Sequence, residues 1–265
     1  MIWLVHQKII TLFKGKKVTV TTPFEKQESL LIPEASKDNN KIINYLRNER
    51  GIDIGIISDC MDKGKLYQTK TYSNVAFVSR NQEDEIKHIF LRGTIKTIDH
   101  ETGKIQSFKM DSKGSDKNFP FTLGGNPNAT KVYVFESSID VLSHATLCKI
   151  NNMEQSLTSS HRIALHGTSF GALKTFLKDN PNITTIVPCL DGDDVGKRRS
   201  KKMQEEFSQM GYIVENHRPP KVGKDYNEML LSCKEFGINK NISYQTAQTS
   251  QINEDPITEC DGVEI

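Results

Sequence analysis

The sequence lacks several features that would assign it to a common class of protein. Its 35 Lys and Arg residues nearly balance 33 Asp and Glu residues, so net charge alone does not indicate a nucleic-acid binder. No apolar run approaches the roughly 20 residues that span a bilayer. The apolar residues 1–6 have neither the basic start nor the cleavage site of a secretory signal. We therefore expect a cytoplasmic protein that makes no membrane contact.

Cysteine is scarce and scattered. The five cysteines are Cys60, Cys148, Cys189, Cys233 and Cys260. None belongs to a C-x-x-C pair, which argues against a zinc ribbon, so we expect no zinc. Scattered cysteines of this kind suit a reducing compartment, in agreement with a cytoplasmic location.

Composition and periodicity divide the chain into four regions. Residues 1–40 are a basic lead-in, and residues 41–124 combine a helical pattern with several short strands, which indicates a small α+β domain. The strand-like segments are residues 74–79, 88–93 and 104–109. Turn-forming residues separate them, which favours an antiparallel meander. We place the domain boundary at Gly124 and Gly125.

A different pattern occupies residues 128–238, where short apolar strands alternate with helices. The expected strands are residues 131–136, 162–166, 183–190 and 212–215, and the expected helices are 138–150, 172–177, 195–210 and 226–236. This alternation predicts an α/β fold, a parallel sheet with helices on both faces. Residues 239–265 are polar and aperiodic, and we expect a disordered tail.

Carboxylates directly follow two of these strands. Glu136 ends the first strand, while Asp191 and Asp193 come after the third. The carboxyl ends of parallel strands meet at one edge of a sheet, where three carboxylates repel one another unless a cation offsets their charge. Oxygen ligands favour a hard divalent ion. The pattern therefore predicts a site for Mg²⁺, with Mn²⁺ as an alternative.

Three segments resemble, in order and spacing, the motif series of a Toprim domain. They are residues 135–142, 165–168 and 189–198. In that family a glutamate, a Gly-Thr pair and an Asp-x-Asp-x-x-Gly follow three successive strands. The likeness covers the whole α/β region and is strongest to bacterial primases and to Toprim-like proteins of plasmids and integrative elements. It implies a Rossmann-like fold and Mg²⁺-dependent phosphoryl transfer on nucleic acid.

The preceding domain resembles the one found before Toprim in mobile-element proteins, whose function is obscure. The matching segments are residues 45–52, 66–67, 74–78, 91–94 and 113–117. Primases begin with a zinc ribbon, which this chain does not contain. Another protein of replication or transfer would then supply template recognition.

The resemblance implies a role for each acid. Asp191 and Asp193 would bind Mg²⁺, and Glu136 would share the metal or transfer a proton. Four further residues are expected near this centre: Asp140, Gly167, Thr168 and Asp225. A plain loop is the alternative for the Gly-Thr pair, and a helix cap is the alternative for Asp225.

Two groups of basic residues are expected to meet a nucleic-acid backbone. Lys197, Arg198 and Arg199 begin the helix behind the Asp-x-Asp loop, and Lys113 with Lys117 lies in the preceding domain. A solvated helix face is the alternative for the first group. The implied partner is DNA or RNA, with single-stranded DNA favoured.

Other functions fit parts of the sequence. Residues 167–171 match the nucleophile elbow G-x-S-x-G, and Ser169, Asp191 and His217 follow the order of a serine hydrolase, although the other acids then have no role. A nucleic-acid-binding module without catalysis would keep the Toprim fold. Among catalytic activities, primase-like synthesis comes first and nuclease action second. A topoisomerase is disfavoured because no strand-passing domain is evident.

Overall fold

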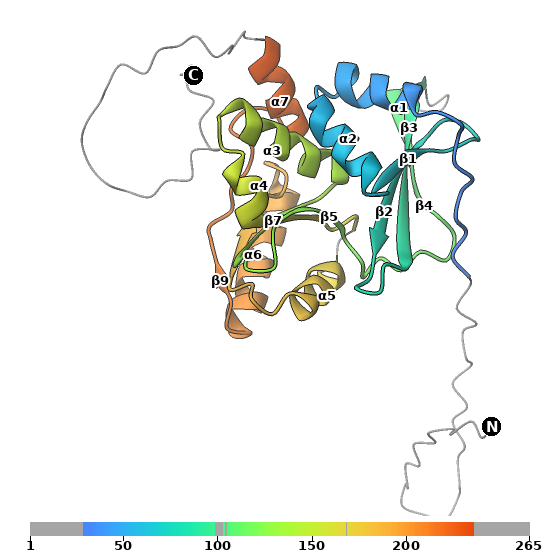
Figure 1. The fold of residues 1–265 in the computed structure, drawn as a ribbon. Coiled ribbons are helices and arrows are strands. Elements are labelled where there is room, and N and C mark those ends of the chain that lie inside the picture. The colour runs from blue at the N-terminus through green and yellow to red at the C-terminus, as the bar shows by residue number, and fades with distance from the viewer. Residues whose placement is uncertain (1–28, 99–102, 104, 168, 236–265) are drawn as a thin grey trace, which may run out of the picture.

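The structure is a computed structural model that describes residues 29–98, 103, 105–167 and 169–235. Two sheets of four and five strands lie side by side, with helices packed around them (Figure 1). No helix in the described ranges is both long enough and apolar enough to cross a membrane. Three expectations lie outside the described residues: those for residues 1–28, Thr168 and the tail 239–265.

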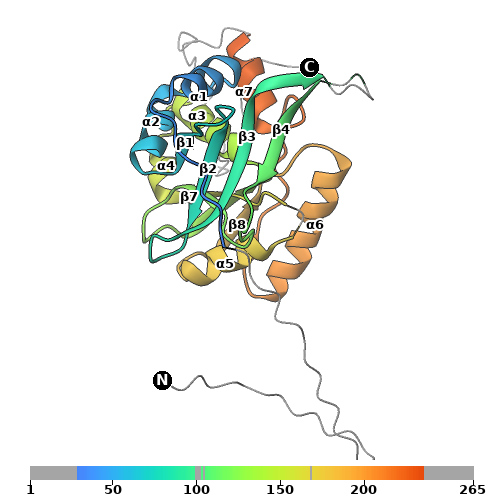
Figure 2. The same ribbon diagram turned by 90° about the vertical axis from the view of Figure 1, so that its right-hand side faces the viewer.

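The four-stranded sheet is an antiparallel meander, which confirms the predicted arrangement. Its strands are β1 (Leu66–Gln68), β2 (Val75–Arg80), β3 (Ile86–Ile98) and β4 (Ile105–Asp111). Figure 2 shows β2, β3 and β4 running side by side at the front of the molecule. Three helical segments precede the sheet: α1 (Asn40–Asn44), η1 (Tyr45–Glu49) and α2 (Ile54–Asp62). The sequence pattern predicted the first helical region but neither α2 nor β1.

The five-stranded sheet has the order β5-β7-β6-β8-β9. Its strands are β5 (Phe121–Gly124), β6 (Lys131–Phe135), β7 (Ser160–Ala164), β8 (Thr185–Pro188) and β9 (Ile213–Val214). Neighbours are parallel except for β5, which pairs antiparallel with β7. This confirms the α/β fold with a largely parallel sheet. The domain boundary at Gly124 and Gly125 stays a prediction; β5, which ends at Gly124, pairs with this second sheet.

Helices cover both faces of the five-stranded sheet. They are α3 (Ser138–Ile150), α4 (Gln155–Ser159), α5 (Gly171–Asp179), α6 (Asp194–Gln209) and α7 (Tyr226–Glu235). Side chains of β6 alternate between the faces: Tyr133 and Phe135 pack with α3 and α7, whereas Val132 and Val134 pack with α5 and α6. Each such buried side chain contributes about 1.5–3 kcal/mol, which fixes the register of the central strand.

A shared apolar core joins the two sheets. Residues of the first half, such as Leu46 and Phe77, belong to the same buried cluster as Phe121 and Leu142 of the second. The rings of Phe77 and Phe121 meet edge to face, with centroids 5.4 Å apart. The meander thereby packs against the five-stranded sheet, and a pocket lies between the two.

Candidate active site between the two sheets

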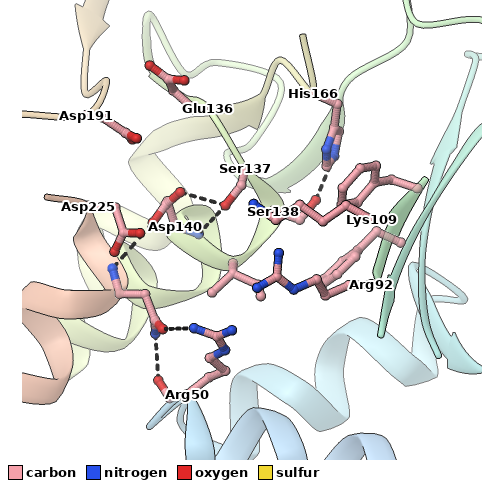
Figure 3. Close-up of a pocket in the computed structure, with 14 residues that line it drawn as sticks. Arg50, Arg92, Lys109, Glu136, Ser137, Ser138, Asp140, His166, Asp191 and Asp225 are labelled. Atoms are coloured by element: carbon pink, nitrogen blue, oxygen red, sulfur yellow. Dashed lines mark hydrogen bonds between the residues drawn. The ribbon is translucent and has the colours of Figure 1, made fainter. Parts of the chain in front are cut away.

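Two of the predicted acids meet at one edge of the five-stranded sheet. Glu136 directly follows β6, and Asp191 lies three residues beyond β8. These strands are hydrogen-bonded parallel neighbours, so both carboxylates reach the same edge, as strand-end logic predicts. They line a pocket of about 330 Å³ together with Asp140 and Asp225 (Figure 3).

Burial and neighbouring carboxylates raise the pKa values of Asp191 and Asp140. Burial raises the pKa of Asp191 to about 7, and the carboxylates of Glu136, Asp225 and Asp193 act in the same direction. Burial also raises the pKa of Asp140 to about 7, with repulsion from Asp225 as the next cause. Negative charge is therefore costly in this pocket unless a cation offsets it.

A cation of the protein itself reaches the cluster. Arg199 Nη1 lies 2.9 Å from Glu136 Oε2, and Arg199 Nη2 donates to the Gly167 carbonyl at 2.5 Å. The other carboxylate oxygen of Glu136, Oε1, is buried without a hydrogen-bond partner. Arg199, expected to meet a nucleic-acid backbone, thus turns its side chain to the acids, whereas Lys197 pairs with Asp194 at the surface.

Asp193 has a structural role in this conformation. Its Oδ1 accepts hydrogen bonds from the N–H groups of Val195 and Gly196, which caps α6, and the residue does not line the pocket. Gly196 explains the spacing of the Asp-x-Asp-x-x-Gly motif, because a Cβ there would lie 2.0 Å from the Asp191 carbonyl oxygen. The tight turn brings the start of α6 directly behind Asp191.

The acids fit a divalent ion only in part. Within the described ranges, no group of three or more His, Cys, Asp or Glu residues is gathered closely enough to hold a metal. Glu136 and Asp191 nevertheless suit a metal ion. Glu136 has a buried carboxylate oxygen without a hydrogen-bond partner. The raised pKa of Asp191 shows that its negative charge is unfavourable without a nearby cation. The three-acid metal set with Asp193 stays a prediction.

Two of the four other residues expected near the centre, Asp140 and Asp225, line the pocket, and Gly167 does not. Asp140 is buried and accepts a hydrogen bond from Ser137 Oγ at 2.6 Å, which holds its carboxylate in place. Asp225 Oδ1 accepts from the Glu228 N–H at 2.8 Å, so it caps α7 and also lines the pocket. The helix-cap alternative for Asp225 is therefore seen in the structure, and its role as a site acid stays a prediction.

The pocket wall opposite the acids is basic. It is formed by Arg50, Arg92 and Lys109 (Figure 3), none of which the pattern analysis singled out. Lys113 and Lys117 do not line the pocket; Lys117 instead pairs with Asp111 at 2.6 Å. The only sequence signal was that Arg50 and Arg92 fall within segments resembling the domain found before Toprim.

The geometry does not support a serine-hydrolase site. Ser169 is exposed, and its Oγ accepts from the Gly171 N–H at 3.4 Å. His217 donates from Nε2 to the Leu190 carbonyl at 3.0 Å. No hydrogen bond joins Ser169 to His217 among the described residues, so the nucleophile-elbow pattern has no base beside it.

Comparison with protein families agrees with this architecture. Residues 133–230 match the family described as Toprim-like, and residues 44–127 match a family described as a protein of unknown function (DUF3991). The chain carries a Toprim domain. A curated relative, the uncharacterized protein pXO2-78 of Bacillus anthracis, is 31% identical over 162 residues, which are 58% of this chain and 43% of that protein. The chain thus spans less than half the length of this relative.

Solved primase structures are similar to the chain at low sequence identity. The DnaG primase catalytic domain bound to single-stranded DNA has a TM-score of 0.49 at 14% identity, covering 74% of this chain and 71% of that one. The E. coli primase catalytic core has a TM-score of 0.45 at 14% identity, covering 73% and 69%. The primase fragment of the bacteriophage T7 primase-helicase has a TM-score of 0.45 at 17% identity, covering 72% and 70%.

The Toprim domain also contributes a histidine that the pattern analysis did not assign. His166 follows β7 with a φ of +50°, which is uncommon for a residue with a side chain. Its ring stacks on Phe90 of β3, with centroids 4.4 Å apart, and its Nε2 lies 2.8 Å from Ser138 Oγ. Burial lowers the pKa of His166 to about 3, so this residue closes the pocket wall as a neutral group.

Proposed function

We propose that this protein is a Mg²⁺-dependent enzyme of phosphoryl transfer on nucleic acid, with primase-like synthesis as the first assignment. The observation that carries the proposal is the meeting of Glu136 and Asp191 at the ends of β6 and β8, in a pocket with a basic opposite wall. Acids on one side and cations on the other suit a substrate that brings a metal-bound phosphate.

The side chains of the pocket suggest a separate role for each acid in the reaction. Bound Mg²⁺, or Mn²⁺ in its place, would neutralise charge on phosphate oxygens, with Glu136, Asp191 and Asp193 as the residues that would hold it. Glu136 Oε1 has no hydrogen-bond partner, which supports Glu136 as the group that would accept the proton of an attacking hydroxyl. Asp140, held by Ser137 and by the Asn227 N–H, keeps the start of α3 in position beside it.

We assign single-stranded DNA as the preferred partner, in the cytoplasm and in the setting of a mobile genetic element. The Bacillus anthracis relative carries the designation of the plasmid pXO2, which supports this setting. Lys197 and Arg198 lie on the exposed side of α6, where they can meet a strand that approaches the pocket. A replication or transfer protein would supply template recognition.

A nucleic-acid-binding role without catalysis is the second candidate. Two observations favour it: Asp193 caps α6, and Arg199 pairs with Glu136. Both interactions use groups that the catalytic proposal gives to a metal. In this role the basic residues would hold nucleic acid, and the acids would balance their charge.

One experiment separates these functions. The full chain is incubated with single-stranded DNA, Mg²⁺ and labelled ribonucleotides, beside Glu136→Gln, Asp191→Asn and the control Ser169→Ala. New oligomers that are lost only in the two acid variants would support a primase, and shortened DNA with the same dependence would support a nuclease. Retained DNA binding without any product from the wild type would favour the binding role.

A further inference from the structure

We propose that Arg50, Arg92 and Lys109 form a phosphate-binding site in the domain of unknown function, which takes the phosphates of a nucleoside triphosphate. This inference rests on the proposed function, because it assigns the substrate class of the same pocket. The family that this domain matches is described as a protein of unknown function. The site lies on the wall opposite Glu136 and Asp191 (Figure 3).

Two of the three cations are held directly opposite each other. Arg92 of β3 and Lys109 of β4 are paired residues of the antiparallel ladder, where like charges destabilise a sheet. The register of β3 and β4 shifts immediately after Arg92, and such irregularities are common beside functional sites. Gly93 makes the close approach possible, because a Cβ there would lie 2.9 Å from Phe108 Cβ.

A tyrosine holds both arginines in place. The buried Tyr45 hydroxyl accepts a hydrogen bond from Arg50 Nε at 2.9 Å and from Arg92 Nε at 3.3 Å. Arg50 Nη1 also donates to Asn227 Oδ1 at 3.1 Å, which connects the guanidinium to the Toprim domain. One hydroxyl thus brings two like charges to one side of the pocket.

The cations lack the carboxylates that would normally balance them. Among the described residues, Arg50, Arg92 and Lys109 form no ion pair with a carboxylate, and the terminal amino groups of Arg92 and Lys109 have no hydrogen-bond partner. Burial lowers the pKa of Lys109, and the two guanidiniums lower it further, while Asp140 and Asp225 act in the opposite direction. Three cations that repel one another and retain free donors form a ready site for an anion with several oxygens.

Pocket size and charge select the ligand. A volume of about 330 Å³ is at the lower end of small-molecule sites, which suits one nucleotide better than a strand. A triphosphate can span from the basic wall to the acids, since both groups line one pocket. The phosphates would contact Arg92 and Lys109, while Tyr45 acts as a positioning residue.

The test measures binding without turnover. Inorganic triphosphate, ATP and a single-stranded oligonucleotide without a 5′-phosphate are titrated into the full chain in the presence of EDTA. The variants are Arg92→Gln, Lys109→Gln and Tyr45→Phe. Lys63→Gln is the matched control, because Lys63 lies in the same domain, is exposed and pairs with Asp59. Melting temperatures establish that each variant is folded. Lys109→Gln removes one of two like charges that are paired across the ladder, so it should be at least as stable as the wild type.

We expect the wild type to bind inorganic triphosphate and ATP. Loss of one charge-assisted contact, about 1.5–3 kcal/mol, corresponds to about a tenfold or greater loss of affinity in Arg92→Gln and Lys109→Gln. Tyr45→Phe should weaken both ligands while Lys63→Gln binds them normally. Unchanged triphosphate affinity in folded Arg92→Gln and Lys109→Gln would overturn the site, and so would a loss confined to the oligonucleotide.

The outcome is separable from the proposed function. Triphosphate binding that depends on Arg92 and Lys109, in a protein that makes no Mg²⁺-dependent product, would support the anion site and reject catalysis. Product formation that depends on Glu136, with no effect of Arg92→Gln or Lys109→Gln on triphosphate binding, would support catalysis and reject the site.

Discussion

Arg199 of α6 is ion-paired with Glu136, at 2.9 Å, at the very edge of the sheet where the Toprim acids converge. The guanidinium also lowers the pKa of Asp191, against the action of the neighbouring carboxylates. A cation of the protein therefore offsets part of the negative charge that a metal ion would offset. If these acids hold Mg²⁺ as proposed, the ion would compete with Arg199 for Glu136, and this competition can be measured.

Removal of Arg199 should strengthen Mg²⁺ binding. In Arg199→Gln no guanidinium offsets the repulsion between the acids. The free energy of binding a divalent ion should therefore become more favourable. A net change of about 1 kcal/mol, the upper range for partly exposed pairs, corresponds to about fivefold in affinity. Calorimetric titration of Mg²⁺ checks this, with Lys202→Gln as a control at an exposed position of the same helix. Equal Mg²⁺ affinity in wild type and Arg199→Gln would show that the pair does not compete with the metal.

The glycine behind Asp191 should not accept a methyl group. In an ordinary helix Gly→Ala stabilises by roughly 0.5–1 kcal/mol, but a Cβ at Gly196 would lie 2.0 Å from the Asp191 carbonyl oxygen. The backbone of the Asp-x-Asp loop would have to move, and we expect Gly196→Ala to lose about 2 kcal/mol or more. Chemical denaturation checks this against Gln204→Ala, an exposed position of α6. Gly196→Ala as stable as the wild type would contradict the close approach.

A buried histidine should make stability depend on pH. Burial, with Arg162 as the next cause, lowers the pKa of His144 well below its ordinary 6.5, and His144 Nδ1 accepts a hydrogen bond from Arg162 Nε at 3.0 Å. The unfolded chain takes up a proton below about pH 6.5 that the folded chain refuses, so this contribution falls as pH falls, by up to about 1.4 kcal/mol per pH unit. In His144→Gln, whose amide oxygen can still accept from Arg162, the difference from wild type should shrink from pH 7.5 to pH 5. Parallel stability curves over this range would contradict the prediction.

Most of the fold, and the position of two site acids, could be predicted from the strand ends and the periodicity of the sequence. The apolar β6 and β8, each followed by an acid, were sufficient to place Glu136 and Asp191 at one edge, because parallel strands point the same way. The helices α3 and α6 were also predicted close to their observed bounds. Short elements such as α4 and β5 were missed, since four or five residues carry too little periodic signal.

The basic pocket wall could not be predicted from the sequence for a different reason. Arg92 and Lys109 meet through the register of β3 and β4, and Arg50 joins them through the Tyr45 hydroxyl. The pairing of Arg92 with Lys109 depends on the register between β3 and β4, which shifts just after Arg92. The position of Arg50 depends on packing between the domains. Local sequence patterns show neither of these. The same limit applies to Asp193, whose position after a strand fits a metal ligand and a helix cap equally well; the structure shows the cap.

Neutralising Asp191 should stabilise the metal-free protein. Burial and the carboxylates of Glu136, Asp225 and Asp193 raise the pKa of Asp191 to about 7, so the folded chain binds its proton more readily than the unfolded chain between about pH 4 and 7. Stability from this group is present at acidic pH and is lost as pH rises through 7. At pH 8 in EDTA, Asp191→Asn removes the unfavourable charge, and we expect a higher melting temperature than in wild type. Added Mg²⁺ should raise the melting temperature of wild type but not that of Asp191→Asn, because the ion offsets the same repulsion. A lower melting temperature for Asp191→Asn in EDTA would mean that the Asp191 charge stabilises the fold and that the cluster has no need of a cation.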